Sequence, residues 1–309
     1  MLSVVVPVYN EVEALAELDA RLRKALDGLG ACEIVLVDDG SSDGSWAEMR
    51  RLAAADRRIR LVKLSRNFGH QVALTAGLDA ARGDAIVTLD ADLQDPPELI
   101  PELVARWREG NDVVYAVRTE REGETAFKRA TARVFYRLIR RLAHVEIPEN
   151  AGDFRLLSRR AADALHEMPE RARFLRGMTS WIGLRQAAVP FGRAGRHSGK
   201  TKYPTHKMVA FATDAVTSFS SWPIRLVTRL GLLVVLFCIV YLGYTIYLRF
   251  FTDRTVQGWT SVIVVVLLIG GTQLLSLGII GQYVARIFDE VKGRPLYIVE
   301  ETVDGGSDD

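Results

Sequence analysis

Two long apolar runs without a charged side chain, residues 230–248 and 259–285, restrict the fold more than any other feature of the chain. As helices of about 19 and about 27 residues that rise 1.5 Å per residue, both would cross a hydrocarbon core about 30 Å thick. Arg229, Arg249 and Arg286 stand at their ends, which is typical of membrane spans. The alternative is a pair of core helices in a soluble protein, but core helices rarely run this far without a charge. We therefore expect a transmembrane hairpin of two helices.

The loop between the two runs, residues 249–258, is too short to be a domain, so both ends of the chain should lie on one side of the membrane. The N-terminal sequence has no cationic start followed by an apolar stretch, which argues against a signal peptide. Residues 1–228 should then stay in the cytoplasm, in a multi-pass membrane protein. The expected parts are a catalytic domain at 1–206, an interfacial helix at 207–228, two membrane helices within 229–286 and a cytoplasmic tail at 287–309.

Short apolar runs alternate with helical patterns along the N-terminal part of the chain. Leu15, Leu18, Leu22 and Leu26 are spaced to lie on one face of a helix over residues 12–29. The apolar runs are continuous, as expected for parallel strands that are covered on both faces. This pattern predicts an α/β domain with a parallel sheet. The expected strands are residues 3–6, 33–37, 59–64, 85–89 and 112–116.

Three polar clusters follow three of these strands, at residues 7–11, 38–45 and 90–98. Ligands of open α/β sheets bind outside the carboxyl ends of the strands, so the clusters should form one site. Asp90 and Asp92 in the last cluster would repel each other unless a divalent cation lay nearby. Mg²⁺ and Mn²⁺ prefer such oxygen ligands and usually share them with a substrate diphosphate. The clusters therefore predict metal-assisted chemistry on a phosphorylated substrate.

Two further segments have amphipathic helical patterns. Residues 127–142 place Arg129 and Arg133 on a basic stripe beside an apolar one, and residues 208–222 carry an apolar stripe that ends at Trp222. Both could lie on an anionic membrane surface. A solvated face for the first segment and packing on the soluble domain for the second stay open as alternatives. The formal net charge of +2 is too small to indicate a nucleic-acid partner.

The three clusters, in this order and spacing, resemble the nucleotide-sugar-binding half of the family 2 glycosyltransferases, which adopt the GT-A fold. Asp38-Asp39-Gly40 alone could be an ordinary turn. Four more motifs and the helical hairpin are similar to the polyprenyl-phosphate glycosyltransferases, relatives of dolichol-phosphate mannose synthase, in their bacterial form with two transmembrane helices. The resemblance covers nearly the whole chain. The four motifs are residues 66–70 (Arg-Asn-Phe-Gly-His), 93–98 (Leu-Gln-Asp-Pro-Pro-Glu), 152–156 (Gly-Asp-Phe-Arg-Leu) and 196–203 (Arg-His-Ser-Gly-Lys-Thr-Lys-Tyr).

The resemblance implies where the donor and the metal bind. Acidic side chains suit the base and ribose of the donor, because they accept hydrogen bonds from hydroxyl and N–H groups. The metal, Mg²⁺ or Mn²⁺, would bridge the donor diphosphate and neutralise charge on the leaving nucleoside diphosphate. A helix cap ahead of Pro96 and Pro97 would explain one acid of the third cluster but not the others. The implied donor-binding residues are Pro7, Tyr9, Glu11, Val37, Asp39, Asp90 and Ala91, and the implied metal ligands are Asp90, Asp92 and Gln94.

The implied acceptor is a polyprenyl phosphate, whose oxygen is already anionic near neutral pH. The reaction then needs positioning and charge stabilisation more than a strong base. Arginine suits this task because its guanidinium binds phosphate in a bidentate manner. Ordinary surface charge is the alternative for each basic candidate. The candidates are Arg118, Arg129 and Arg133 from the strand end and the basic helix, and Arg196 and Lys202, which could close over either phosphate.

Asp153 stands where relatives that glycosylate hydroxyl groups carry their catalytic base. Its role here stays open, since it could orient the acceptor phosphate, approach the metal, or act as a base that the acceptor does not strictly require. A purely structural role as the cap of a helix that starts near Ser158 fits less well, because Asp153 lies several residues upstream.

Together these features predict inverting transfer of one sugar from a UDP- or GDP-sugar to polyprenyl (undecaprenyl) phosphate, at the cytoplasmic face of a bacterial inner membrane, for glycan or lipid modification. A homo-oligomer, such as a tetramer, is consistent with the resemblance. One alternative is a processive polysaccharide synthase, although its Gln-x-x-Arg-Trp motif is absent, since Trp181 lacks the preceding residues. The other is a catalytically silent membrane binding module, although such a module would not need all three acidic clusters.

Overall fold

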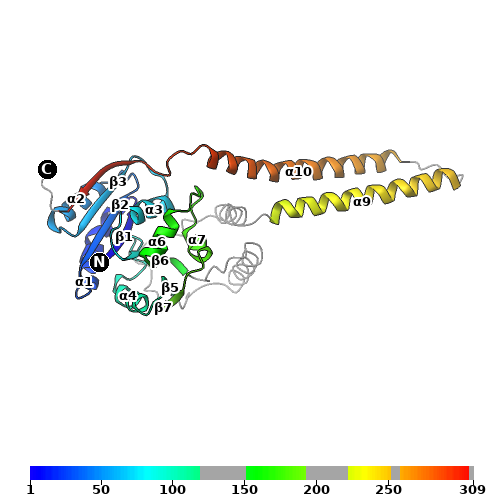
Figure 1. The fold of residues 1–309 in the computed structure, drawn as a ribbon. Coiled ribbons are helices and arrows are strands. Elements are labelled where there is room, and N and C mark those ends of the chain that lie inside the picture. The colour runs from blue at the N-terminus through cyan, green and yellow to red at the C-terminus, as the bar shows by residue number, and fades with distance from the viewer. Residues whose placement is uncertain (119–150, 193–221, 252–257, 306–309) are drawn as a thin grey trace. The chain divides into compact units, whose positions relative to one another are not determined.

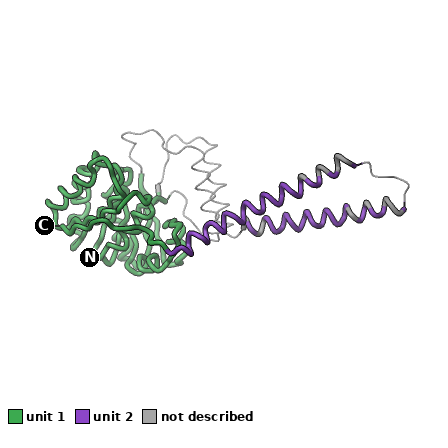
Figure 2. The backbone as a smooth tube through the Cα atoms, turned by 90° about the horizontal axis from the view of Figure 1, so that it is seen from above, with its two compact units in different colours: residues 1–205, 294–309 green, residues 206–293 purple. Residues whose placement is uncertain are grey.

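The computed structural model describes residues 1–118, 151–192, 222–251 and 258–305 of the 309-residue chain. The chain divides into two compact units (Figure 2). Unit 1 combines Met1–Thr205 with the C-terminal Arg294–Asp309, and unit 2 is His206–Gly293. The C-terminal segment thus returns to the unit that contains the N-terminus.

An eight-stranded mixed sheet lies at the centre of unit 1 (Figure 1). All five strands predicted from the sequence are present, and β1 pairs in parallel with β2 and β4, as β2 does with β3. However, β6 runs antiparallel to β4 and β5, and β8 runs antiparallel to β3, so the prediction of a wholly parallel sheet is wrong at these two strands. The strand order is β7-β5-β6-β4-β1-β2-β3-β8, with β1 (Leu2–Val8), β2 (Cys32–Asp38), β3 (Ile59–Leu64), β4 (Ala85–Thr88), β5 (Val113–Arg118), β6 (Ala151–Ser158), β7 (Gln186–Phe191) and β8 (Val299–Asp304).

Helices pack on both faces of this sheet. On one face α1 contacts α2 and α4, and on the other α6 contacts α3 and α7. The alternation of side chains along the strands decides which face they cover, since Val4 and Val6 join Leu15 and Leu18 of α1 in the core, whereas Val5 faces α3. The helices are α1 (Val12–Leu26), α2 (Ser45–Ala55), α3 (His70–Ala80), α4 (Ile100–Arg108) after the short 3₁₀ turn η1 (Pro97–Leu99), α6 (Arg159–His166) and α7 (Leu175–Trp181).

Gly77 allows α3 to lie close to the sheet. A Cβ atom at this position would lie 2.2 Å from Cγ1 of Val5 and 3.1 Å from Cγ2 of Val37. Both valines are fully buried strand residues with little room to move. The close approach fixes α3, whose first residue, His70, follows β3 at the carboxyl edge of the sheet.

The last strand, β8, lies within residues 287–309, where the sequence predicts only a cytoplasmic tail. Ion pairs support its pairing with β3, since Lys63 Nζ lies 2.9 Å from Glu300 Oε1 and Arg60 Nε lies 3.0 Å from Asp304 Oδ1. Most of its side chains are exposed, so no apolar pattern in the sequence reveals it, and backbone pairing holds it in place. Part of the predicted tail is therefore an edge strand of unit 1.

Unit 2 contains two long helices that contact each other, α9 (Trp222–Phe251) and α10 (Trp259–Val291). They include both apolar runs, and many of their large apolar side chains are exposed. The helix α9 continues through residue 229, where a boundary was expected. Among the described residues one helical stretch, Leu268–Val291, is long and apolar enough to cross a membrane, and the apolar stretch Val227–Tyr241 is shorter. The two helices are thus present, but a membrane hairpin with two spans is not confirmed.

Replacing Gly77 with alanine should destabilise unit 1. The added methyl group would overlap Val5, and overpacking a well-packed core typically costs about 1–3 kcal/mol. The loss would be measured as a lower melting temperature of the purified full-length protein. Gly192→Ala is the matched control, because a Cβ atom there meets nothing within 4 Å. Equal melting temperatures for the two variants would contradict the close packing of α3 on the sheet.

Candidate active site

The loops after β1 and β2 are joined by hydrogen bonds at the carboxyl edge of the sheet. The backbone N–H of Ser42 donates to Asn10 Oδ1 at 2.8 Å, and Asn10 adopts a left-handed conformation (φ 55°), which asparagine tolerates. Asp43 accepts the N–H of Val12 at 3.2 Å and that of Ser45 at 2.9 Å, which are the first residues of α1 and α2. The first two predicted clusters therefore form one braced surface.

Asp39 joins the loop between β3 and α3 to this surface. Its buried carboxylate accepts the N–H of Phe68 at 2.7 Å and that of Gly69 at 3.0 Å. Gly40 permits this contact, because its φ is +71° and a Cβ atom there would lie 2.6 Å from the backbone of Arg66. Burial raises the pKa of Asp39, and the two backbone hydrogen bonds partly oppose that shift. Asp39 thus holds the loop, and its contact with a donor stays a prediction.

The other predicted donor-binding residues differ in exposure. Pro7 and Val37 are paired in register on β1 and β2 and are buried, so their side chains belong to the sheet and its packing. Ala91 is also buried. In contrast, Tyr9 is 49% exposed and Glu11 is half-buried, both after β1. In this group Tyr9 is the most exposed, and Asp90 is half-buried like Glu11.

Asp90 lies at the same edge, because β4 pairs in parallel with β1 and ends two residues before it. Its Oδ1 is buried and accepts no hydrogen bond from the described residues, although His70 Nε2 lies 3.4 Å away. Burial raises the pKa of Asp90 to about 6, and the neighbouring His70 opposes that shift. Asp92 is exposed, and its Oδ1 accepts the N–H of Gln94 at 3.1 Å. The third cluster therefore joins the other two at one edge of the sheet.

Asp90 and Asp92 fit a divalent cation that takes part of its ligands from a substrate. A buried carboxylate oxygen without a donor is costly unless a proton or a cation compensates, and Asp90 Oδ1 is such an atom. In the part of the chain that the structure describes, no group of three or more His, Cys, Asp or Glu side chains could hold a metal ion. Mg²⁺ is often bound by one or two carboxylates together with phosphate oxygens and water. The assignment of Asp90, Asp92 and Gln94 as ligands stays a prediction.

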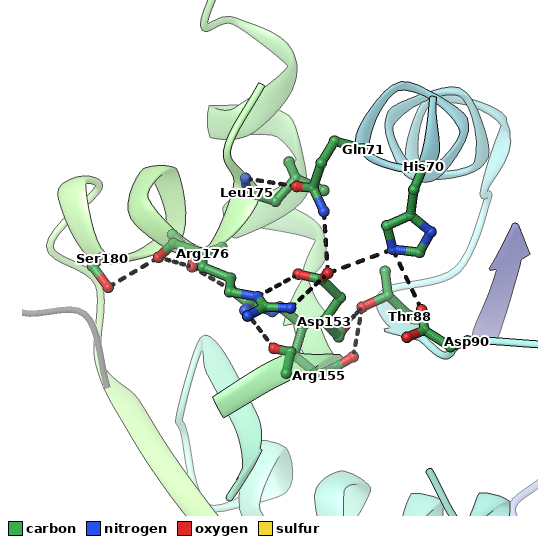
Figure 3. A network of polar contacts seen from close by, with 11 residues as sticks. His70, Gln71, Thr88, Asp90, Asp153, Arg155, Leu175, Arg176 and Ser180 are labelled. Carbon is green, nitrogen blue, oxygen red and sulfur yellow. Dashed lines mark hydrogen bonds and ion pairs between the residues drawn. The ribbon is translucent and has the colours of Figure 1, made fainter. Parts of the chain in front are cut away.

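A second polar network is centred on Asp153 of β6 (Figure 3). Arg176 of α7 binds both of its carboxylate oxygens, with Nε 2.9 Å from Oδ1 and Nη2 3.0 Å from Oδ2. Gln71 Nε2 donates to Oδ2 at 3.1 Å, and His70 Nε2 lies 3.4 Å from the same oxygen. Because His70 is equally near Asp90, its ring lies between the two carboxylates (Figure 3). The network joins β6 to α3 and α7.

The negative charge of Asp153 is strongly stabilised. Burial alone would raise its pKa, but the hydrogen bond with His70 and the charge of Arg176 hold the pKa well below its usual range. A second guanidinium, that of the buried Arg155, adds to this and donates to Thr179 Oγ1 of α7. Asp153 is therefore an anion throughout the physiological pH range.

Some members of this network were not identified from the sequence. The predictions included Asp153, but they assigned no role to Arg176, which is one of several arginines between residues 171 and 176 and has no distinguishing pattern. His70 had one signal, since it is the last residue of the motif at 66–70, and Gln71 follows it directly, but neither was given a role. The helix predicted to start near Ser158 is present as α6, and Ser158 caps it with its own side chain. The alternative that Asp153 is the cap is therefore wrong.

Most of the predicted acceptor-binding residues lie outside the described residues, as do residues 127–142, which were predicted to form a basic helix, and the first part of the predicted interfacial helix. Arg118 is described as the last residue of β5. Since β5 and β4 both run antiparallel to β6, Arg118 ends at the same edge as Asp90. Its contact with an acceptor stays a prediction. The residues outside the described part are Arg129, Arg133, Arg196 and Lys202.

Comparison with known proteins relates this chain to glycosyltransferases by sequence. The model of the family "Glycosyl transferase family 2" matches residues 3–165. The uncharacterized glycosyltransferase YkcC of Bacillus subtilis is 47% identical over 97% of this chain and 93% of its own length. The bactoprenol glucosyl transferase of Shigella phage SfII is 39% identical over 97% of this chain and 98% of its own length. Among solved structures, glucosyl-3-phosphoglycerate synthase from Mycobacterium tuberculosis is 24% identical with a TM-score of 0.49, over 70% of this chain and 77% of that chain.

Replacing Asp39 with asparagine should loosen the loop between β3 and α3. Asparagine has one acceptor oxygen, so the N–H of either Phe68 or Gly69 would meet an amide nitrogen that cannot accept it, and an unsatisfied buried donor costs about 1–3 kcal/mol. The full-length variant should therefore melt at a lower temperature than the parent protein. Asp27→Asn, at an exposed position after α1, is the control that should change little. An unchanged melting temperature for Asp39→Asn would show that Asp39 does not hold this loop.

Proposed function

Because the chain belongs to glycosyl transferase family 2 and is a glycosyltransferase, we propose that it transfers one sugar from a nucleotide sugar to a polyprenyl phosphate. The observation that carries this proposal is its 39% identity to bactoprenol glucosyl transferases over 97% of the chain, a share that extends beyond unit 1. Bactoprenol is a polyprenol, so the acceptor would be undecaprenyl phosphate. The names of these relatives favour glucose as the sugar.

The donor, a UDP- or GDP-sugar, would bind over the loops after β1, β2 and β4. Tyr9 and Glu11 are accessible there and suit contacts with the base and ribose. Asp90, Asp92 and Gln94 would hold Mg²⁺ or Mn²⁺, which would supply positive charge to the diphosphate as it leaves. Hydrogen bonds between the loops after β1 and β2 hold this part of the site in place before the donor arrives, which lowers the entropic cost of reaching the reactive geometry.

The acceptor phosphate would approach the sugar from the other side. Its oxygen is already ionised near pH 7, so the site must orient it and offset its charge. Direct attack on the anomeric carbon would break the bond to the nucleoside diphosphate and invert the configuration there. Arg118, Arg129 and Arg133 would bind the acceptor phosphate, and Arg196 and Lys202 would close over either phosphate.

The helices of unit 2 would bring the protein to its lipid substrate. A polyprenyl chain stays in the bilayer, so its phosphate must be reached at the membrane surface. In this proposal α9 and α10 cross the inner membrane as a hairpin, supported by the length and apolar character of Leu268–Val291. The segment at 127–142 and the part of 207–228 that precedes α9 would lie on the cytoplasmic surface, where the active site faces. A homo-oligomer, such as a tetramer, is part of the same proposal.

Transfer of radiolabel tests the proposed reaction. Purified full-length protein with undecaprenyl phosphate, Mg²⁺ and labelled UDP- or GDP-sugars should move label from one donor into lipid that is extractable with organic solvent. Label in a long water-soluble polymer would indicate a processive synthase instead. Donor binding without transfer to any acceptor would indicate a silent binding module. Either of these results would contradict the proposal.

Two controls address the metal. Chelation of divalent cations and the variant Asp92→Ala should each lower labelling by on the order of 100-fold, since lost stabilisation of developing charge typically costs that much. Asp27→Ala, at an exposed position at the far end of α1, should retain normal labelling. Metal-free activity equal to that with Mg²⁺ or Mn²⁺ would overturn the assignment of the metal site.

A further inference from the structure

The carboxylate of Asp153 has little capacity left for a substrate. Its Oδ2 accepts from Gln71 Nε2 and Arg176 Nη2 and also faces His70 Nε2, while its Oδ1 accepts from Arg176 Nε (Figure 3). A carboxylate offers about four lone-pair sites, and these contacts occupy most of them. Asp153 is also enclosed, with 8% of its side chain exposed, whereas 44% of the His70 side chain is exposed. In this pair His70 is the group that a substrate can reach.

The partners of Asp153 fix the starts of two helices. His70 and Gln71 are the first two residues of α3, and Leu175 and Arg176 are the first two residues of α7. Gln71 also joins the helices directly, because its Oε1 accepts the N–H of Leu175 at 3.0 Å. One carboxylate on β6 therefore holds both helix starts, and the position of the His70 ring depends on it.

We propose that Asp153 is a positioning residue and not the general base: held by Arg176 and Gln71, it fixes the His70 ring beside Asp90, where His70 contacts the donor diphosphate. This inference rests on the proposed function and extends it to residues that have no assigned role there. His70 suits a diphosphate because an imidazolium donates from both ring nitrogens, so Nδ1 can donate to a phosphate oxygen while Nε2 faces Asp153 and Asp90. Asp153 then acts through His70, and Arg176 acts through Asp153.

If Asp153 were instead the general base, removal of Arg176 would change the activity differently. A base needs a lone pair within reach of the proton that it accepts, and loss of Arg176 would free two such positions on Asp153 and raise its pKa. Activity that depends on a base would therefore survive or rise. A positioning residue would instead lose its fixed orientation, and a displacement of about 1 Å can cost on the order of 100-fold in rate.

The test compares Asp153→Asn, Arg176→Gln and the double variant in the full-length protein with Mg²⁺ and the donor that labels lipid. Each should lower kcat about 100-fold while the KM for the donor changes far less, and the double variant should lose no more than either single one. Arg176→Lys keeps the charge without the bidentate contact, and it should recover part of the activity. Arg58→Gln is the matched control, since Arg58 binds both oxygens of Asp56 outside this site and should be dispensable for turnover.

A second comparison tests the action through His70. Adding Asp153→Asn to His70→Asn should cost little beyond the loss from His70→Asn alone. The proposal would be overturned if the losses in kcat of the two single variants multiplied in either double variant. Near-normal turnover of Arg176→Gln, with Asp153→Asn inactive, would also overturn it. Melting temperatures confirm that each variant is folded, and Arg176→Lys serves in place of any that is not.

The assay records both lipid label and release of nucleoside diphosphate, so it separates this inference from the proposed function. If the parent protein labels no lipid with any donor, the proposed acceptor is wrong. Hydrolysis of UDP-glucose by water then still gives the readout, because it uses the same diphosphate contacts. Parallel losses of hydrolysis in Asp153→Asn and Arg176→Gln would support the positioning role, and loss in Asp153→Asn alone would overturn it.

Discussion

The buried ion pair between Asp153 and Arg176 is the interaction on which the rest of the candidate site depends. Removing two charges from water costs several kcal/mol per ion, and bidentate geometry with a further hydrogen bond from Gln71 offsets that cost. Breaking such a pair would leave an uncompensated buried charge, so Asp153 and Arg176 hold β6 and α7 together, and Gln71 adds α3. Because β6 runs antiparallel beside β4, Asp153 comes to lie across from Asp90, and His70 occupies the space between them.

The site has two sides with different construction. On the nucleotide side, the loops after β1, β2 and β3 are held together by hydrogen bonds between backbone N–H groups and the side chains of Asn10, Asp39 and Asp43. Several residues there, Asp39 among them, are used for bracing, whereas Tyr9 is exposed and Glu11 is half-buried. On the reaction side, charged side chains are held by one another. Asp90 belongs to both sides. Its buried Oδ1 accepts no hydrogen bond from the described residues, and a bound cation would compensate the charge of this oxygen.

The sequence was sufficient for those parts of the fold in which local pattern and tertiary structure agree. Continuous apolar runs identified five strands, and the carboxyl-edge rule brought the clusters after β1, β2 and β4 together. The antiparallel strand β6 was missed because Asp153 and Arg155 interrupt its apolar pattern, and the partner that satisfies Asp153 lies 23 residues away. The strand β8 was missed because pairing with β3 and ion pairs such as that of Lys63 with Glu300 hold it, and neither leaves a local pattern. Long-range electrostatic contacts of this kind cannot be read from spacing along the chain.

The most direct measurement is an experimental structure of the full-length protein with Mn²⁺ and the nucleoside diphosphate of its donor. In that structure Asp90 and Asp92 should bind Mn²⁺ together with diphosphate oxygens, His70 should contact the diphosphate, and Asp153 should remain paired with Arg176. A diphosphate bound away from this edge would contradict the assignment of the active site. An Asp153 side chain that has left Arg176 and points to the acceptor would contradict its role as a positioning residue.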